Sequence, residues 1–251
     1  MIQPSGRPTT ARFASVSGTR VATLLTALNL LVAAGAGLIA LKFTSSTNAS
    51  LVALALMSVL TPALVKTLGF WKDVGFKRPH AWRLLVVPAV VVLVLPFLRG
   101  AQTPPAGTVL LLLVGYLLTG WYEELWSRGL VLRLLSPSGV RRAVVVSSLL
   151  FAALHLGNVL YRDPVIVAAQ AVGALCSGMA YAAVRVRTGS LWAAMLVHAL
   201  HDFTLHFTTF PVIALNVTQD VLLLAYALVL LRGVPRAGVD PRPFDAPDAH
   251  V

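Results

Sequence analysis

Residues 109–135 read VLLLLVGYLLTGWYEELWSRGLVLRLL, an apolar run that holds two adjacent carboxylates and, four residues later, an arginine. The run is longer than the roughly 20 residues that an α-helix needs to cross a hydrocarbon core about 30 Å thick. It therefore predicts a transmembrane helix that either continues well past the bilayer or bends near Trp121.

Similar apolar runs recur along the chain with short polar breaks. Apolar residues make up 57% of the 251 residues, charged residues only 12%, and the mean hydropathy is +0.82. Soluble domains are roughly a quarter charged, so this composition excludes water as the main solvent. The runs predict about eight transmembrane helices, at residues 21–43, 51–70, 84–98, 109–135, 143–160, 165–184, 191–210 and 212–231. Polar residues at 216–220 suggest that the last helix begins later than residue 212.

Both ends of the chain are polar. We predict disordered tails at residues 1–20 and 232–251, around one membrane domain at residues 21–231. If the N-terminus is cytoplasmic, only Lys42, Arg99 and Arg162 of the 20 basic residues fall in outer loops. Because cytoplasmic loops hold the excess of lysine and arginine, we predict a multi-pass protein of the cell membrane with both termini cytoplasmic.

The charge distribution and the cysteine content argue against nucleic-acid binding and against cysteine-based sites. The net charge of +11 does not indicate nucleic-acid binding, because the basic residues lie mostly between apolar spans and form no stripe with interleaved aromatic residues. The single cysteine, Cys176, can form neither an intrachain disulfide nor a cysteine-based metal site. The lipid bilayer is therefore the first predicted partner, and no nucleic-acid partner is expected.

Glu123 and Glu124 lie within apolar sequence, where ionisable side chains cost several kcal/mol and by default indicate function. Glu124 and Arg128 are four residues apart, so they share a helix face and can form an ion pair. Glu123 projects roughly 100° away from them and is left free for chemistry. The alternative is that this segment lies at the cytoplasmic interface, where the charges are simply solvated.

Two later apolar spans also hold isolated polar groups. His155 ends the stretch 151–155 (FAALH), and His198 shares a helix face with Asp202, four residues on. A single buried histidine is more often a core residue than a catalyst. Three apolar helices that each deliver polar groups are expected to bring them together, because each group would otherwise be unpaired in lipid. We therefore predict an all-α fold, a polytopic transmembrane helical bundle of about eight helices around an internal polar cavity.

The predicted cavity contains the groups needed for peptide hydrolysis without a covalent intermediate. Glu123, with His155 beside it, can accept a proton from water. His198 can donate a hydrogen bond to the oxyanion that forms when this water attacks a peptide carbonyl. The serines of these spans lack the spacing of a nucleophile elbow and are interpreted as structural.

At these positions the sequence resembles the CAAX-processing endopeptidase and bacteriocin-processing (CPBP, or Abi) family of intramembrane proteases. The family motifs are Glu-Glu-x-x-x-Arg, Phe-x-x-x-His and His-x-x-x-Asn or a related polar residue, each on its own helix. They correspond here, in the same order, to residues 123–128, 151–155 and 198–202. Residues 73–79 (DVGFKRP) and 188–192 (TGSLW) also look like the family, which places a CPBP-like core at about 74–210.

The resemblance implies that Glu123 and His155 activate water, and that Glu124 and Arg128 hold the geometry. It also places His198 and residue 202 at the oxyanion.

Asp202 departs from the usual asparagine. An ionised aspartate would repel an oxyanion, so we expect Asp202 either to be protonated or to orient His198, and we favour the orienting role.

Members of this family are often described as metal-dependent. His155, His198 and Glu123 could supply a three-ligand zinc site with an open position. The sequence lacks the His-Glu-x-x-His arrangement of helical zinc proteases, and its polar groups suffice for hydrolysis by glutamate-activated water. We predict that no cofactor is required, with zinc as the possible alternative.

The leading hypothesis is an intramembrane endopeptidase that cuts a membrane-associated peptide or small membrane protein. One alternative is a non-catalytic immunity or scaffold protein with the same fold. Another is a proton-coupled transporter that uses the buried carboxylates, although the paired repeats and correspondingly broken helices of such transporters are not found.

Overall fold

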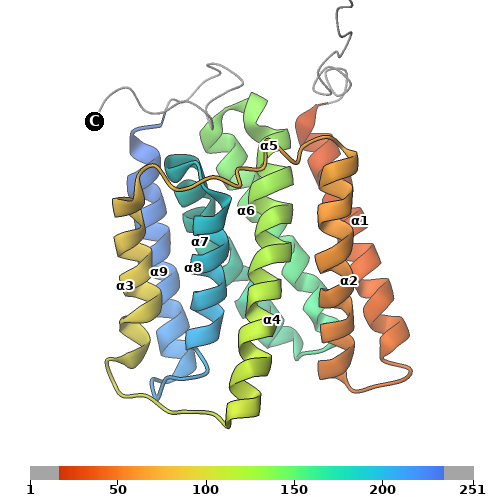
Figure 1. Cartoon of the computed structure of the whole chain (residues 1–251), viewed down its shortest axis with the longest axis vertical. Helices are drawn as coiled ribbons and strands as arrows, with labels where there is room; N and C mark the ends of the chain where they lie inside the picture. The colour runs from red at the N-terminus through yellow and green to blue at the C-terminus, as the bar shows by residue number, and fades with distance from the viewer. Residues whose placement is uncertain (1–16, 235–251) are drawn as a thin grey trace, which may run out of the picture.

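The computed structural model describes residues 17–234, and within this range the regular elements are helices. They stand side by side in one bundle (Figure 1). This arrangement confirms the predicted all-α class. The two predicted tails, at residues 1–20 and 232–251, lie mostly outside the described residues.

Six helices of the described range are long and apolar enough to cross a membrane. They are α1 (Gly18–Ala40), α2 (Ser46–Thr67), the continuous helix Ala106–Ser138, the helix Val140–Leu160, α7 (Pro164–Thr188) and α9 (Val212–Arg232). Two shorter helical segments stand among them, Trp82–Phe97, which contains α3 (Val86–Leu93), and α8 (Leu191–Thr204). These eight segments match the eight predicted spans.

The outer surfaces of these helices are strongly apolar. Leu24, Val165 and Ile213, from three different helices, expose 69%, 78% and 82% of their surfaces. So many exposed large apolar side chains are rare on soluble monomers and are suited to lipid. The chain is therefore a multi-pass membrane protein.

The long helix Ala106–Ser138 changes geometry halfway along its length. It consists of α4 (Ala106–Glu124), a π-helical segment (Leu125–Val131), α5 (Leu132–Leu135) and a short 3₁₀ turn. The predicted irregularity near Trp121 is thus a π-helical segment that begins directly after the two carboxylates. Such wide turns are rare and occur frequently at functional sites.

Two predicted boundaries in the last third of the chain are wrong. The span predicted at 191–210 ends at Thr204, because residues beyond it pair with the loop before α4 through Gln102 N to Phe207 O and Thr209 N to Gly100 O. The last helix begins at Val212 and not later. Its polar residues therefore lie within the helix.

A two-residue break positions α8. Gly189 ends α7 in the left-handed conformation with φ 68°, which suits a residue without Cβ. The Ser190 side chain then accepts a hydrogen bond from Ala193 N in the first turn of α8. This break fixes where the helix with His198 and Asp202 starts.

The connection between α2 and α3 crosses the end of the bundle (Figure 1). It is tied to the α7–α8 break by hydrogen bonds from Leu191 N to Gly75 O, at 2.7 Å, and from Ser190 Oγ to Lys77 O, at 2.6 Å. The Arg185 guanidinium also donates to Val74 O at 3.1 Å. Residues 73–79 and 188–192, which the sequence singled out separately, therefore form one structural unit.

This unit makes Gly75 a sensitive position. Gly75 has φ +90°, and a Cβ on it would overlap the Arg185 guanidinium. We expect Gly75→Ala to lower the free energy of unfolding by about 1–3 kcal/mol. Thermal unfolding followed by tryptophan fluorescence measures this loss. Gly107→Ala is the matched control, because its Cβ would meet open space in α4, and an equal loss in the control would contradict the prediction.

Candidate active site

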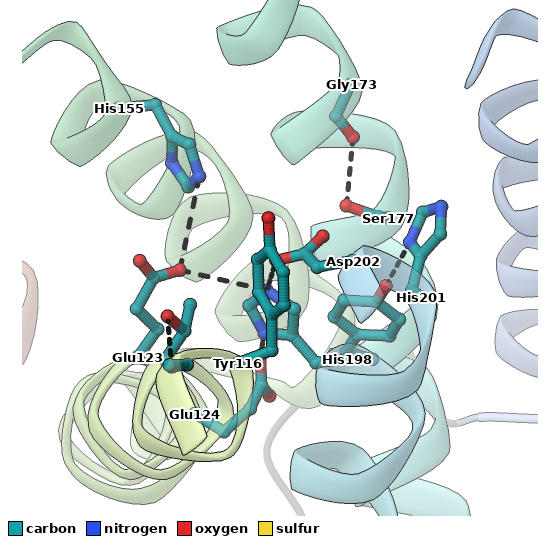
Figure 2. A network of polar contacts seen from close by, with 12 residues as sticks. Tyr116, Glu123, Glu124, His155, Gly173, Ser177, His198, His201 and Asp202 are labelled. Carbon is teal, nitrogen blue, oxygen red and sulfur yellow. Dashed lines mark hydrogen bonds and ion pairs between the residues drawn. The ribbon is translucent and has the colours of Figure 1, made fainter. Parts of the chain in front are cut away.

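The polar residues of the three motifs lie together inside the bundle (Figure 2). Glu123 and Glu124 come from the last turn of α4, and His155 ends α6 (Val140–His155). His198 and Asp202 lie on successive turns of α8. The structure therefore brings the predicted side chains of three helices to one place.

Glu124 forms the buried centre of this cluster. Its Oε1 accepts hydrogen bonds from Arg128 Nη1 at 2.7 Å and from His198 Nδ1 at 2.8 Å. The Glu124 and Arg128 side chains have no exposed surface. The predicted ion pair is confirmed, and the same oxygen also ties α4 to α8.

Aromatic rings cover the rest of the buried guanidinium. Arg128 Cζ lies 4.0 Å from the centre of the Phe151 ring and 5.5 Å from that of Tyr181. Cation–π contacts of this kind stabilise a desolvated cation by about 2 kcal/mol or more. Phe151 of the second motif thus packs against the arginine of the first motif. Spacing along the chain does not indicate this contact.

Glu123 lies beside His155 and His198, the histidines of the other two motifs, without a hydrogen bond to either. Its Oε2 is 4.0 Å from His155 Nε2 and 3.8 Å from His198 Nε2, beyond hydrogen-bond range, and its side chain is 20% exposed. Among the described residues this oxygen has no hydrogen-bond partner. It is the free carboxylate that the helical spacing predicted.

The hydrogen bonds of the two imidazoles define which of their nitrogens face Glu123. His155 Nδ1 is 3.0 Å from Phe151 O, and a carbonyl only accepts, so Nδ1 donates. In the neutral ring, His155 Nε2 therefore presents a lone pair toward Glu123. His198 Nδ1 donates to Glu124 in the same way, which leaves His198 Nε2 to face Glu123.

Asp202 lies beside the same nitrogen of His198. Its Oδ2 is 3.5 Å from His198 Nε2, and 31% of its side chain is exposed. The close contact that orients His198 is made on Nδ1 by Glu124, whereas Asp202 places a carboxylate next to Nε2. The orienting role expected of Asp202 stays a prediction, and the hydrogen bond that holds His198 Nδ1 is made with a residue of another helix.

Sequence reasoning missed two polar residues around the site, Tyr181 and Gln219. Tyr181 on α7 packs its ring on His198, with centroids 5.1 Å apart, and its hydroxyl lies 2.6 Å from His201 Nδ1. Gln219 on α9 is fully buried and contacts His201. The polar stretch at 216–220 was the available signal, but local hydropathy suggested an interfacial position.

The donor set contains ligand types that zinc accepts, two imidazole nitrogens and a carboxylate. Among residues 17–234, no group of three His, Cys, Asp or Glu side chains is arranged as a metal site. Hydrolysis without a metal stays a prediction, and zinc held by Glu123, His155 and His198 stays its alternative.

The buried Glu124–Arg128 pair makes stability depend on Arg128. Arg128→Ala leaves the Glu124 carboxylate buried with one partner fewer, so we expect a loss of about 3–5 kcal/mol in the free energy of unfolding. Arg142→Ala, at an exposed position of α6, is the control and should unfold like the wild type. Chemical denaturation in detergent measures both, and a loss below about 1 kcal/mol at Arg128 would contradict the prediction.

Comparison with protein families finds a match over residues 105–204, to the model described as type II CAAX prenyl endopeptidase Rce1-like. Comparison with curated proteins and with solved structures finds no match. The matched segment contains all three motifs, so the resemblance drawn from the sequence is confirmed. Residues 105–204 are therefore similar to the Rce1-like family of CAAX-type membrane endopeptidases.

Proposed function

We propose that this protein is an intramembrane endopeptidase in which Glu123 and His155 activate a water molecule to hydrolyse a peptide bond. One observation supports this above all others: Glu123 Oε2 lies 4.0 Å from His155 Nε2 and 3.8 Å from His198 Nε2, and it is bonded to neither. Polar groups at such separations are suited to a shared water.

The first step is the attack of water. Glu123 Oε2 and the lone pair of His155 Nε2 are both acceptors, so a water between them donates one hydrogen to each. Its remaining lone pair then points away from both and can attack the carbonyl carbon of the substrate. One water proton moves to Glu123 as the new C–O bond forms.

The second step is stabilisation of charge and departure of the amine. His198 donates from Nε2 to the oxyanion in its imidazolium form, which the carboxylates of Glu124 and Asp202 stabilise by charge. As the C–N bond breaks, the proton on Glu123 passes to the leaving nitrogen. The second water proton remains on the new carboxyl group, so no covalent enzyme intermediate forms.

The orientation proposed for the protein places both termini in the cytoplasm of a cell-membrane protein. The start of α1 and the end of α9 lie at the same end of the bundle (Figure 1). Arg20, Arg141, Arg142 and Arg232 are near this end, and the Arg141 guanidinium donates to Arg232 O. An excess of basic residues on one side supports a cytoplasmic assignment for that side.

The proposed substrate class is a prenylated peptide, by analogy with the printed description of the family. The surface between α4 and α8 is apolar here, with a small pocket lined by Leu113, Leu117, Leu196, Leu200 and Phe203, with Tyr116 and Ala199. An apolar group bound at this surface would lie against the two helices that bear Glu123 and His198.

The proposal is tested with Glu123→Gln, which is nearly isosteric. The probe is an internally quenched peptide added to proteoliposomes. Its last four residues are a farnesylated cysteine, two aliphatic residues and one final residue. The same peptide without the farnesyl group is the comparison. We expect cleavage by the wild type and a loss of at least about 100-fold in the variant, because the general base is removed. Mass spectrometry identifies the bond that is cut.

Asp220→Asn is the control, since it alters a partly buried carboxylate of α9 that lies in none of the motifs. This variant should cleave at the wild-type rate. Full cleavage by Glu123→Gln would refute water activation by this residue. If the wild type cuts neither peptide and Glu123→Gln retains biological activity, the protein is a scaffold. Substrate uptake driven by a pH gradient would instead identify a transporter.

Metal dependence has its own test. We expect cleavage to persist in the presence of 1,10-phenanthroline, because the protein's own groups supply the base and the oxyanion donor. Loss of cleavage that returns on addition of zinc would establish zinc as the cofactor. The unfolding temperature, measured with and without chelator, separates loss of a metal-dependent reaction from loss of the fold.

A further inference from the structure

A second network of buried polar groups lies behind His198. Tyr181 Oη is 2.6 Å from His201 Nδ1, His201 Nε2 is 3.3 Å from Gln219 Oε1, and Gln219 Nε2 is 3.0 Å from Val91 O. The four residues belong to α7, α8, α9 and α3. Each of them is more than nine-tenths buried. Figure 2 shows His201 on the same helix as His198 and Asp202.

The donor and acceptor properties of these groups determine the direction of each hydrogen bond in the network. Val91 O can only accept, so the amide of Gln219 must present its NH₂ group to it and its oxygen to His201. That oxygen also only accepts, so His201 Nε2 donates. His201 Nδ1 then accepts from the Tyr181 hydroxyl. Each side-chain polar atom of Tyr181, His201 and Gln219 thus has a hydrogen-bond partner, as buried networks require.

The network ends at Tyr181, whose ring lies against the imidazole of His198, the proposed oxyanion donor. The Tyr181 ring stacks on His198 with centroids 5.1 Å apart and planes 26° from parallel. Glu124 already holds His198 Nδ1 at 2.8 Å, but one hydrogen bond leaves the ring free to rotate about it. The stacked ring restricts that rotation, so the two contacts together determine where His198 Nε2 points.

We propose that Tyr181, His201 and Gln219 are positioning residues that hold His198 through one directed hydrogen-bond chain, with His201 as its Nε2–H tautomer. The catalytic consequence rests on the proposed function, whereas the chain and the tautomer do not. Gln219 and the accepting carbonyl of Val91 lie outside the matched residues 105–204. Helices α3 and α9 thereby complete the site that the matched domain contains.

The first test does not depend on activity. Nitrogen NMR of the full chain labelled with ¹⁵N-histidine, in lipid nanodiscs, reports the protonation of each ring nitrogen. His198→Gln and His201→Gln assign the two sets of signals. We expect a protonated Nε2 and an unprotonated Nδ1 for His201, and a shift of the His198 signals in Tyr181→Phe. The Nδ1–H tautomer, or unchanged His198 signals, would overturn the proposal.

The second test uses cleavage of the farnesylated peptide. Tyr181→Phe keeps the stacked ring and removes only the hydroxyl, and Gln219→Leu removes the end of the chain. We expect each to lower kcat by about 10-fold while KM changes by less than about two-fold. Tyr181→Leu, which also removes the ring, should lower kcat further than Tyr181→Phe.

The matched control is Gln170→Leu, on the same helix as Tyr181, where the glutamine contacts Asn158 and no residue of the network. It should leave kcat unchanged. A kcat unchanged in both Tyr181→Phe and Gln219→Leu, with normal unfolding temperatures, would refute positioning. A wild type that cleaves nothing refutes the proposed function alone, because the NMR result still decides whether the chain exists.

Discussion

The site depends on one carboxylate oxygen. Glu124 Oε1 accepts from Arg128 within its own helix and from His198 on α8, in a place without exposed surface. A buried charge that lacks partners is strongly unfavourable, so both donors are constrained to reach the same atom. The position of α8 relative to α4 is therefore set by this contact, and with it the position of every group on α8.

The second motif is attached to this centre through a single residue. The Phe151 ring covers the Arg128 guanidinium, and the Phe151 carbonyl accepts from His155 Nδ1. One residue thus packs against the cation and also determines which nitrogen of His155 faces Glu123. The three motifs that are separate in the sequence form a continuous set of contacts.

The start of the short helix α8 is held by contacts with other parts of the protein. The helix has 14 residues, fewer than a bilayer requires, and is preceded by the break at Gly189 and Ser190. The connection between α2 and α3 bonds to this break through Gly75 and Lys77. Irregular backbone is tolerated near membrane depth when other parts of the protein satisfy it in this way.

The sequence by itself determined the eight helical segments and the Glu124–Arg128 pair, because hydrophobic runs and four-residue spacing are local properties of the chain. It also identified Glu123 as the carboxylate that does not pair with Arg128. Only the tertiary structure decided that Glu124 orients His198 and that Gln219 faces the interior. These facts depend on contacts between helices far apart in sequence. Local hydropathy cannot distinguish a polar residue that faces water from one that faces a partner on another helix.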